Sequence, residues 1–157
     1  MYDSVLVATD GSEASAAAVD HGIALAARLK VPLHGLAVVE TRTGYDNAIV
    51  DPAEVETRLR SEAETALESV ESTAREADVA VVTACQTGVP HEEILAYVEE
   101  RDVDLVVIGA QGRSTFRRVL LGSTADALVR LSPVPVLVVG DDSAADVRVE
   151  DDEVADE

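Results

Sequence analysis

The chain has 157 residues, and its charge is extreme: 31 acidic residues against 12 basic ones give a formal net charge of −19. This length suits one domain with its own hydrophobic core. Such a charge excludes a broad basic face for nucleic acid or an anionic membrane. Cys85 is the only cysteine, which excludes an internal disulfide and a multi-cysteine metal site. Without a transmembrane-length apolar run or a signal peptide, we expect a cytoplasmic protein.

The negative charge is unevenly distributed. Residues 141–157 contain nine acidic residues and one basic residue, whereas residues 1–140 contain 22 and 11. We therefore expect one domain over residues 1–140 and an acidic, disordered tail over residues 141–157. Lys30 is the only lysine, and an acidic chain with little lysine and few aromatic residues suits a halophilic setting, where salt screens like charges. The alternative is an ordinary cytosolic protein with a solubilising tail.

The first half of the chain alternates apolar runs with amphipathic segments. Residues 5–8 form a continuous apolar run, typical of a strand buried on both faces. Ser12 is placed to cap a helix that ends near residue 29. Residues 33–39 read as a second strand, and Pro52 opens a long helix that ends near residue 77. The apolar stripe predicted for the first helix is Ala16, Val19, Ile23 and Ala27.

The second half continues the same alternation. Strands are predicted at residues 79–85, 105–108 and 134–139, and helices at residues 91–100 and 123–131. Pro135 near the start of the last strand favours an edge position. The pattern predicts an α/β fold with a five-stranded open parallel sheet, helices on both faces and right-handed crossovers. In such a sheet, ligands bind outside the carboxyl ends of the strands.

The loop after the fourth predicted strand combines glycine with arginine. Gly109 and Gly112 let backbone amides approach a ligand without an intervening Cβ. Gly122 precedes a helix whose first amides and dipole favour an anion. Phosphate-loop and dinucleotide glycine motifs are absent. The loop therefore reads either as a phosphate cradle or as a flexible helix entry with solvated arginines. Its three arginines are Arg113, Arg117 and Arg118.

The spacing Gly109-x2-Gly112-x9-Gly122-Ser123 resembles the ATP-binding motif of the universal stress proteins. The similarity spans residues 1–140 and includes the opening VLVATDGS and the closing SPVPVLVV. It implies the ATP-binding subgroup of that family and a Rossmann-like fold of the adenine nucleotide alpha hydrolase type. The ligand implied is ATP or another adenine nucleotide, with Mg²⁺. Relatives commonly form homodimers through the last strand, here residues 134–139.

The resemblance also implies roles for individual residues. Asp10 would contact the ribose, beside Ala8 and Thr9 on the adenine side. The backbone of Val38 would meet the adenine edge, and Arg113 is a basic residue near the phosphates. The interpretation of Asp10 as a cap for the first helix remains open. The phosphates would be held by Gly109, Gly112, Gly122, Ser123 and Thr124.

We therefore expect a nucleotide-dependent stress-response regulator rather than an enzyme, since no strand-end loop supplies a catalytic histidine or cysteine. The alternatives are a dimeric interaction module with no nucleotide and a nucleotide hydrolase of related architecture. Residues 41–51, with Tyr45, are a candidate flap over the adenine. We expect no metal site, a solvated His21, a small core role for Cys85 and a solvated row of glutamates on the long helix. That row is Glu54, Glu56, Glu62, Glu64, Glu68 and Glu71.

Overall fold

The computed structural model describes residues 1–40, 51–111 and 121–140. Outside these ranges lie the predicted flap with Tyr45 (apart from Asp51), the predicted tail, and the loop residues Gly112, Arg113, Arg117 and Arg118. The described chain alternates strands and helices as predicted, and no boundary differs from its prediction by more than two residues. The strands are β1 (Val5–Thr9), β2 (Leu33–Val39), β3 (Val81–Thr87), β4 (Leu105–Gly109) and β5 (Val136–Val139). The helices are α1 (Glu13–Leu29), α2 (Pro52–Glu76), α3 (Pro90–Glu100) and α4 (Ser123–Leu131).

The five strands form one parallel sheet in the order β3-β2-β1-β4-β5. β1 lies in the middle, where Val7 pairs with Gly35 on one side and Val107 on the other. The chain first builds outward from β1 through β2 to β3 and then returns to β4, so the strand order reverses between β1 and β4. β5 is an edge strand, which confirms the inference from Pro135.

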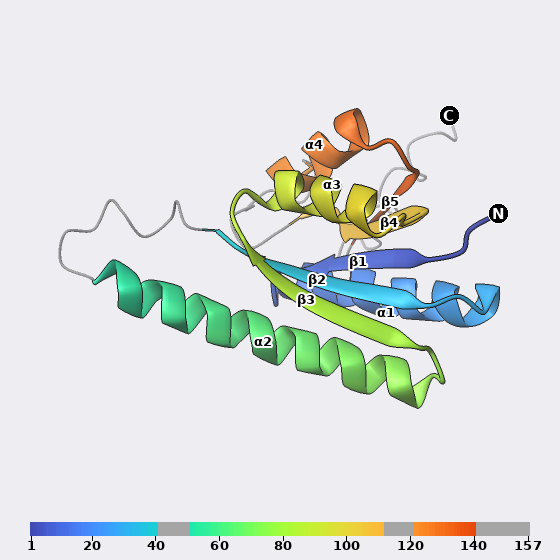
Figure 1. Ribbon diagram of the computed structural model, residues 1–157, viewed down its shortest axis with the longest axis horizontal. Coiled ribbons are helices and arrows are strands. Elements are labelled where there is room, and N and C mark those ends of the chain that lie inside the picture. Colours follow the sequence, from blue (N-terminus) through green and yellow to red (C-terminus); the bar gives the residue numbers. More distant parts are fainter. Residues whose placement is uncertain (41–50, 112–120, 141–157) are drawn as a thin grey trace, which may run out of the picture.

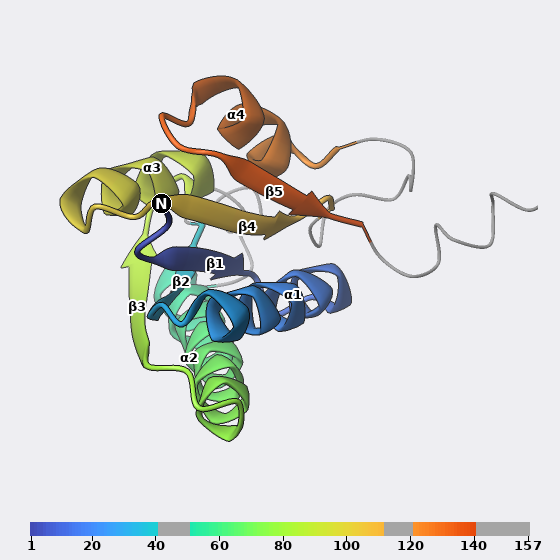
Figure 2. The same ribbon diagram turned by 90° about the vertical axis from the view of Figure 1, so that its right-hand side faces the viewer.

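Alternating residues of the central strands supply two hydrophobic cores. Val5 and Val7 of β1 face α1 and α2, whereas Leu6 and Ala8 face α3 and α4. Figure 2 shows the two pairs of helices on opposite faces of the sheet. β1 and β4 are buried along their whole length, as expected of central parallel strands that are covered on both sides.

The buried face of α1 differs from its predicted stripe. Val19 and Ile23 are buried as predicted, but Ala16 is exposed and Ser15 is buried instead. The helix is so rich in small residues that alanine spacing does not mark the inward face. The hydroxyl of Ser15 lies 3.1 Å from the hydroxyl of Thr9 at the end of β1, and this contact turns Ser15 inward.

Helix α2 is longer than the strands it covers. Its 25 residues span about 37 Å at the rise of an α-helix, whereas the seven residues of β3 span about 23 Å. The surplus lies at the amino end, where α2 begins beyond the carboxyl ends of the strands (Figure 1). Buried residues of α2 are accordingly confined to its second half, namely Leu67, Val70 and Ala74.

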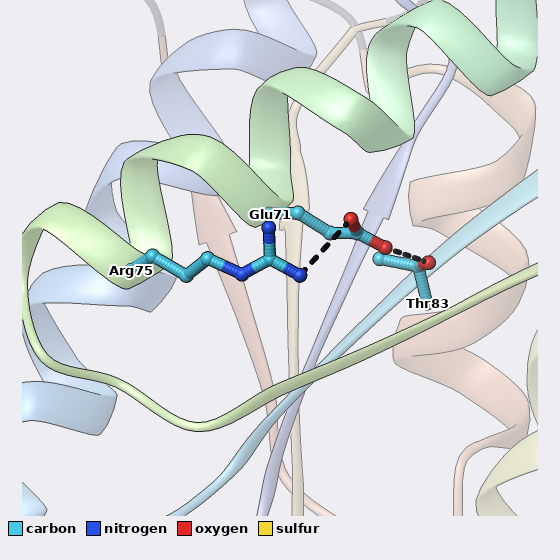
Figure 3. A network of polar contacts seen from close by, with 3 residues as sticks. All are labelled: Glu71, Arg75 and Thr83. Carbon is cyan, nitrogen blue, oxygen red and sulfur yellow. Dashed lines mark hydrogen bonds and ion pairs between the residues drawn. The ribbon is translucent and has the colours of Figure 1, made fainter.

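The second half of α2 is tied to β3 by a polar network (Figure 3). Thr83 donates a hydrogen bond of 2.7 Å from its hydroxyl to Oε1 of Glu71, and Arg75 lies 3.6 Å from Oε2 of the same carboxylate. Glu71 therefore anchors the helix to an edge strand, so its predicted assignment to a fully solvated row is wrong.

None of the described helices combines the length and the apolar character needed to span a membrane.

Candidate functional site

A cleft of about 290 Å³ opens at the carboxyl ends of the central strands, where the strand order reverses. The structure places eight of the ten predicted site residues around it, although β1, β2 and the β4–α4 region lie far apart in sequence. Gly112 and Arg113, the other two, lie outside the described residues. Ligand contact by any of these residues stays a prediction. The eight are Ala8, Thr9, Asp10, Val38, Gly109, Gly122, Ser123 and Thr124.

The turn between β1 and α1 is held by its own side chains. The Ser12 amide donates to Oδ1 of Asp10 at 2.9 Å, and the Gly11 amide donates to the Thr9 hydroxyl at 3.1 Å. Ser12 caps α1 as predicted, accepting a 3.2 Å hydrogen bond from the Ser15 amide. Asp10 thus shapes the turn and also lines the cleft, so its two interpretations are compatible.

Gly109, at the end of β4, is required by packing. A Cβ at this position would lie 2.9 Å from the carbonyl oxygen of Ala14 in the first turn of α1. The expected reason for this glycine, free approach of a ligand to the backbone, is therefore incomplete. The glycine lets the start of α1 lie directly against β4, which brings the β1–α1 turn up to the cleft.

The start of α4 presents backbone amides to the cleft. Gly122 precedes the helix with an extended conformation (φ −63°, ψ 159°), and its amide donates to the Ala110 carbonyl at 2.7 Å. The N-cap residue, Gly122, has no side chain to cap this helix, and the first helical residues, Ser123 and Thr124, line the cleft. The amides of a first helical turn have no partner within the helix, and the helix dipole adds a partial positive charge there. This end of the cleft suits an anion.

The opposite wall of the cleft comes from α2 and the end of β2. Leu59, Glu62 and Ala63, from the overhanging half of α2, face the same cleft as Val38 and Glu40. Sequence reasoning missed the α2 residues as part of the cleft lining. Glu62 is exposed, as its predicted place in a solvated row requires, and it also lines the cleft. The available signal was length, because a helix that outruns its strands must project beyond one end of the sheet. This wall is apolar and carries two carboxylates.

The described histidines and Cys85 do not line the cleft. His21 is exposed as expected. Nδ1 of His34 lies 2.8 Å from the hydroxyl of Tyr97 in a hydrogen bond, and burial lowers the pKa of His34, with the Arg101 guanidinium adding to the effect. Cys85 is half-buried on edge strand β3, so the expected core role is wrong. Burial raises the pKa of its thiol. The described residues contain no group of three or more metal-ligating side chains.

Comparison with known proteins assigns a family. Residues 1–140 match the universal stress protein family. Universal stress protein MJ0531 of Methanocaldococcus jannaschii is 32% identical over 144 residues, covering 88% of this chain and 82% of that protein. The solved universal stress protein UspA from Lactobacillus plantarum is 29% identical with a TM-score of 0.74, covering 88% of this chain and 97% of that one.

A further solved structure holds a ligand. A universal stress protein in complex with cAMP is 27% identical to this chain with a TM-score of 0.68, and the match covers 88% of this chain and 97% of that one. The matches in sequence and structure agree with the five-stranded parallel architecture described above. The chain belongs to the universal stress protein family.

Proposed function

We propose that this protein binds an adenine nucleotide in the cleft and acts as a nucleotide-dependent regulator of the stress response. One observation carries the proposal: residues from distant parts of the chain line one cleft where the strand order reverses. Open α/β sheets bind their ligands at this place. The related universal stress protein in complex with cAMP supports an adenine nucleotide as the ligand class.

The cleft residues favour one direction of binding. The amides at the start of α4 and the hydroxyls of Ser123 and Thr124 would hold the phosphates. Asp10 would accept hydrogen bonds from the ribose, and the end of β2 at Val38 would lie beside the base. The volume of about 290 Å³ is at the lower end of the range for small-molecule sites, which suits a mononucleotide.

A divalent cation is part of the proposal for ATP. The described residues that line the cleft include the carboxylates of Asp10, Glu40 and Glu62 but no lysine, arginine or histidine. These side chains do not offset the charge of a triphosphate. Mg²⁺ is usually bound by one or two carboxylates together with substrate phosphates, and Asp10 at the end of β1 is a donor of that kind. Mg²⁺ would supply positive charge to the phosphates.

We place the function in binding rather than in turnover. Rapid hydrolysis needs a general base held within hydrogen-bond reach of the attacking water. Asp10, the carboxylate at the end of β1, already accepts the Ser12 amide and is assigned to the ribose. Glu40 and Glu62 belong to the wall opposite the start of α4, where the phosphates would be held. We expect phosphate release from bound ATP to be slower than exchange of the nucleotide, which a comparison of the two rates measures.

The proposed function is tested by nucleotide content and calorimetry. Mass spectrometry of the purified protein should identify a copurified adenine nucleotide, and titration with ATP and Mg²⁺ should release or absorb heat with one site per chain. The titration is done in concentrated KCl because the net charge of −19 supports a halophilic setting, in which salt screens repulsion between like charges. A chain that carries no nucleotide and gives no heat with ATP or AMP would contradict the proposal.

The outer edge of the sheet beside α4 supports a homodimer. β5 is an edge strand, and large apolar side chains are exposed there and on the adjacent helix, at 54% for Val129, 60% for Leu131 and 36% for Leu137. Exposed strand edges and apolar patches mark interfaces. We propose pairing through residues 134–139. This edge also favours the second candidate function, an interaction module that works as a dimer without nucleotide.

A charge on β5 should therefore dissociate the dimer. Leu137→Lys is expected to give monomers in light scattering at concentrations where the unmodified protein is a dimer. Val82→Lys is the matched control, because Val82 is 48% exposed on β3, the opposite edge of the sheet. Dimers of the Leu137 variant, or monomers of the Val82 variant only, would place the interface elsewhere.

A further inference from the structure

The two walls of the cleft offer opposite hydrogen-bonding chemistry. The α4 wall presents backbone N–H groups, which only donate. The α2 wall presents the carboxylate of Glu62, which accepts hydrogen bonds and donates none when ionised, between the apolar side chains of Leu59 and Ala63. A ligand that fills the cleft therefore meets donors at one wall and an acceptor at the other.

This polarity determines which part of a nucleotide can lie beside Glu62. The phosphates belong at the start of α4, because amides and the helix dipole favour negative charge. Beside Glu62 a phosphate would be repelled, whereas an O–H or N–H donor would be attracted. α2 packs on β2 and β3, and α4 packs on β5 on the other face of the sheet. The uncharged base therefore lies toward α2.

Contacts on both sides of Glu62 hold its part of the helix against β3. Two residues before it, Arg60 donates a 2.7 Å hydrogen bond from Nη2 to the hydroxyl of Thr87 at the end of β3. Nine residues after it, Glu71 accepts the 2.7 Å hydrogen bond from Thr83. The helix is thus tied to β3 at two points that bracket Glu62. The backbone that carries Glu62 is therefore held in place before a ligand binds, which lowers the cost of bringing its carboxylate to the ligand.

We propose that Glu62 is a specificity-determining residue, whose carboxylate accepts a hydrogen bond from the exocyclic amino group of the base. The assignment rests on the proposed function of the cleft. Glu62 is preferred to Glu40 because it belongs to the α2 wall, whereas Glu40 follows the end of β2, where the backbone of Val38 is already assigned to the base. A base that lacks the amino group does not form this charge-assisted hydrogen bond, and the cleft then binds that base less tightly.

The test compares two ligands that differ by one group. Adenosine 5′-monophosphate carries the amino group, and purine riboside 5′-monophosphate carries hydrogen in its place. One hydrogen bond to a charged acceptor gives an expected preference of about tenfold for the adenosine ligand in the unmodified protein. In Glu62→Ala this ratio of dissociation constants should fall to about one. Calorimetry measures both ligands, and thermal unfolding confirms that each variant is folded.

Glu64→Ala is the matched control. Glu64 is an exposed glutamate on the same helix that does not line the cleft, so its removal should leave the tenfold preference unchanged. An unchanged preference in Glu62→Ala, with adenosine monophosphate still bound, would overturn the role of Glu62 alone. Absence of binding by both ligands in the unmodified protein would overturn the proposed function as well, so the two failures are distinguishable.

Discussion

The two walls of the cleft differ in whether the backbone or the side chains provide the contacts with a ligand. At the α4 wall the backbone provides the contacts, because an uncapped helix start leaves its amides directed at the cleft. At the α2 wall side chains provide them, through Leu59, Glu62 and Ala63. Backbone amides at the α4 wall suit any anion. At the α2 wall, the groups that a ligand meets depend on the side chains at positions 59, 62 and 63. The difference suggests that the α4 wall determines affinity and the α2 wall determines which base is accepted.

The largest expected effect is on the α4 wall. Gly122 is buried and lines the cleft, and its φ of −63° is open to any residue. Gly122→Val should therefore keep the local backbone conformation while filling space beside the first amides of α4, and thermal unfolding checks that the variant is folded. We expect at least a hundredfold loss of affinity for adenosine monophosphate, about 2.8 kcal/mol, measured by calorimetry.

Gly140→Val is the control for this substitution. A Cβ at Gly140 would meet nothing within 4 Å, and Gly140 does not line the cleft. The affinity of the Gly140→Val variant for adenosine monophosphate should match that of the unmodified protein. Retained binding in the Gly122 variant would show that affinity does not come from the start of α4.

A smaller effect, on stability, is expected at Gly109, the cleft-lining glycine at the end of β4. Gly109→Ala brings a Cβ to 2.9 Å from the Ala14 carbonyl, so α1 or β4 must shift. We expect the free energy of unfolding in urea to fall by about 1–3 kcal/mol, as for other overpacked sites. Gly140→Ala should leave it unchanged. An unchanged free energy in Gly109→Ala combined with weaker nucleotide binding would assign this glycine to the ligand instead of to helix packing.

The smallest effect concerns the tie that holds the α2 wall. Arg60→Met keeps most of the aliphatic side chain but removes the hydrogen bond to Thr87. We expect a loss of affinity for adenosine monophosphate of about threefold, because the wall must then be ordered on binding. The exposed Arg58 lies on the same helix, and Arg58→Met is the control. A loss as large as that of Gly122→Val would remove the contrast between the walls.

The fold was predictable because the spacing of apolar residues in the sequence differs between strands and helices. Continuous apolar runs marked β1 and β4, and helical spacing marked α2. Predictions were poorer where neighbours decide the outcome. Residues 79 and 80 continue the apolar pattern into β3, yet β3 begins at Val81. In α1, contact with Thr9 rather than the alanine spacing places Ser15 inward.

The two walls differ in the same way. Gly109, Gly122 and Ser123 belong to one short motif, so their spacing carried the resemblance that predicted a phosphate site. Glu62 and Leu59 belong to no motif, and only the position of α2 relative to the strands brings them to the cleft. Sequence reasoning assigned the glutamate to solvent because it is exposed by its helical spacing, and the cleft-facing role depends on tertiary arrangement. Residue type and helical spacing do not distinguish Glu62, which lines the cleft, from Glu64, which does not.

The overhang of α2 has a consequence for local stability. Its second half buries Leu67, Val70 and Ala74 against the sheet, whereas its first half has no fully buried residue. Segments with little buried apolar surface open at a lower free energy than the rest of a domain. Amide hydrogen exchange should therefore be graded along this one helix, fastest near Pro52 and slowest near Ala74. A nucleotide held against Leu59 and Glu62 would slow exchange in the first half only, which couples occupancy of the cleft to the folding of its own wall.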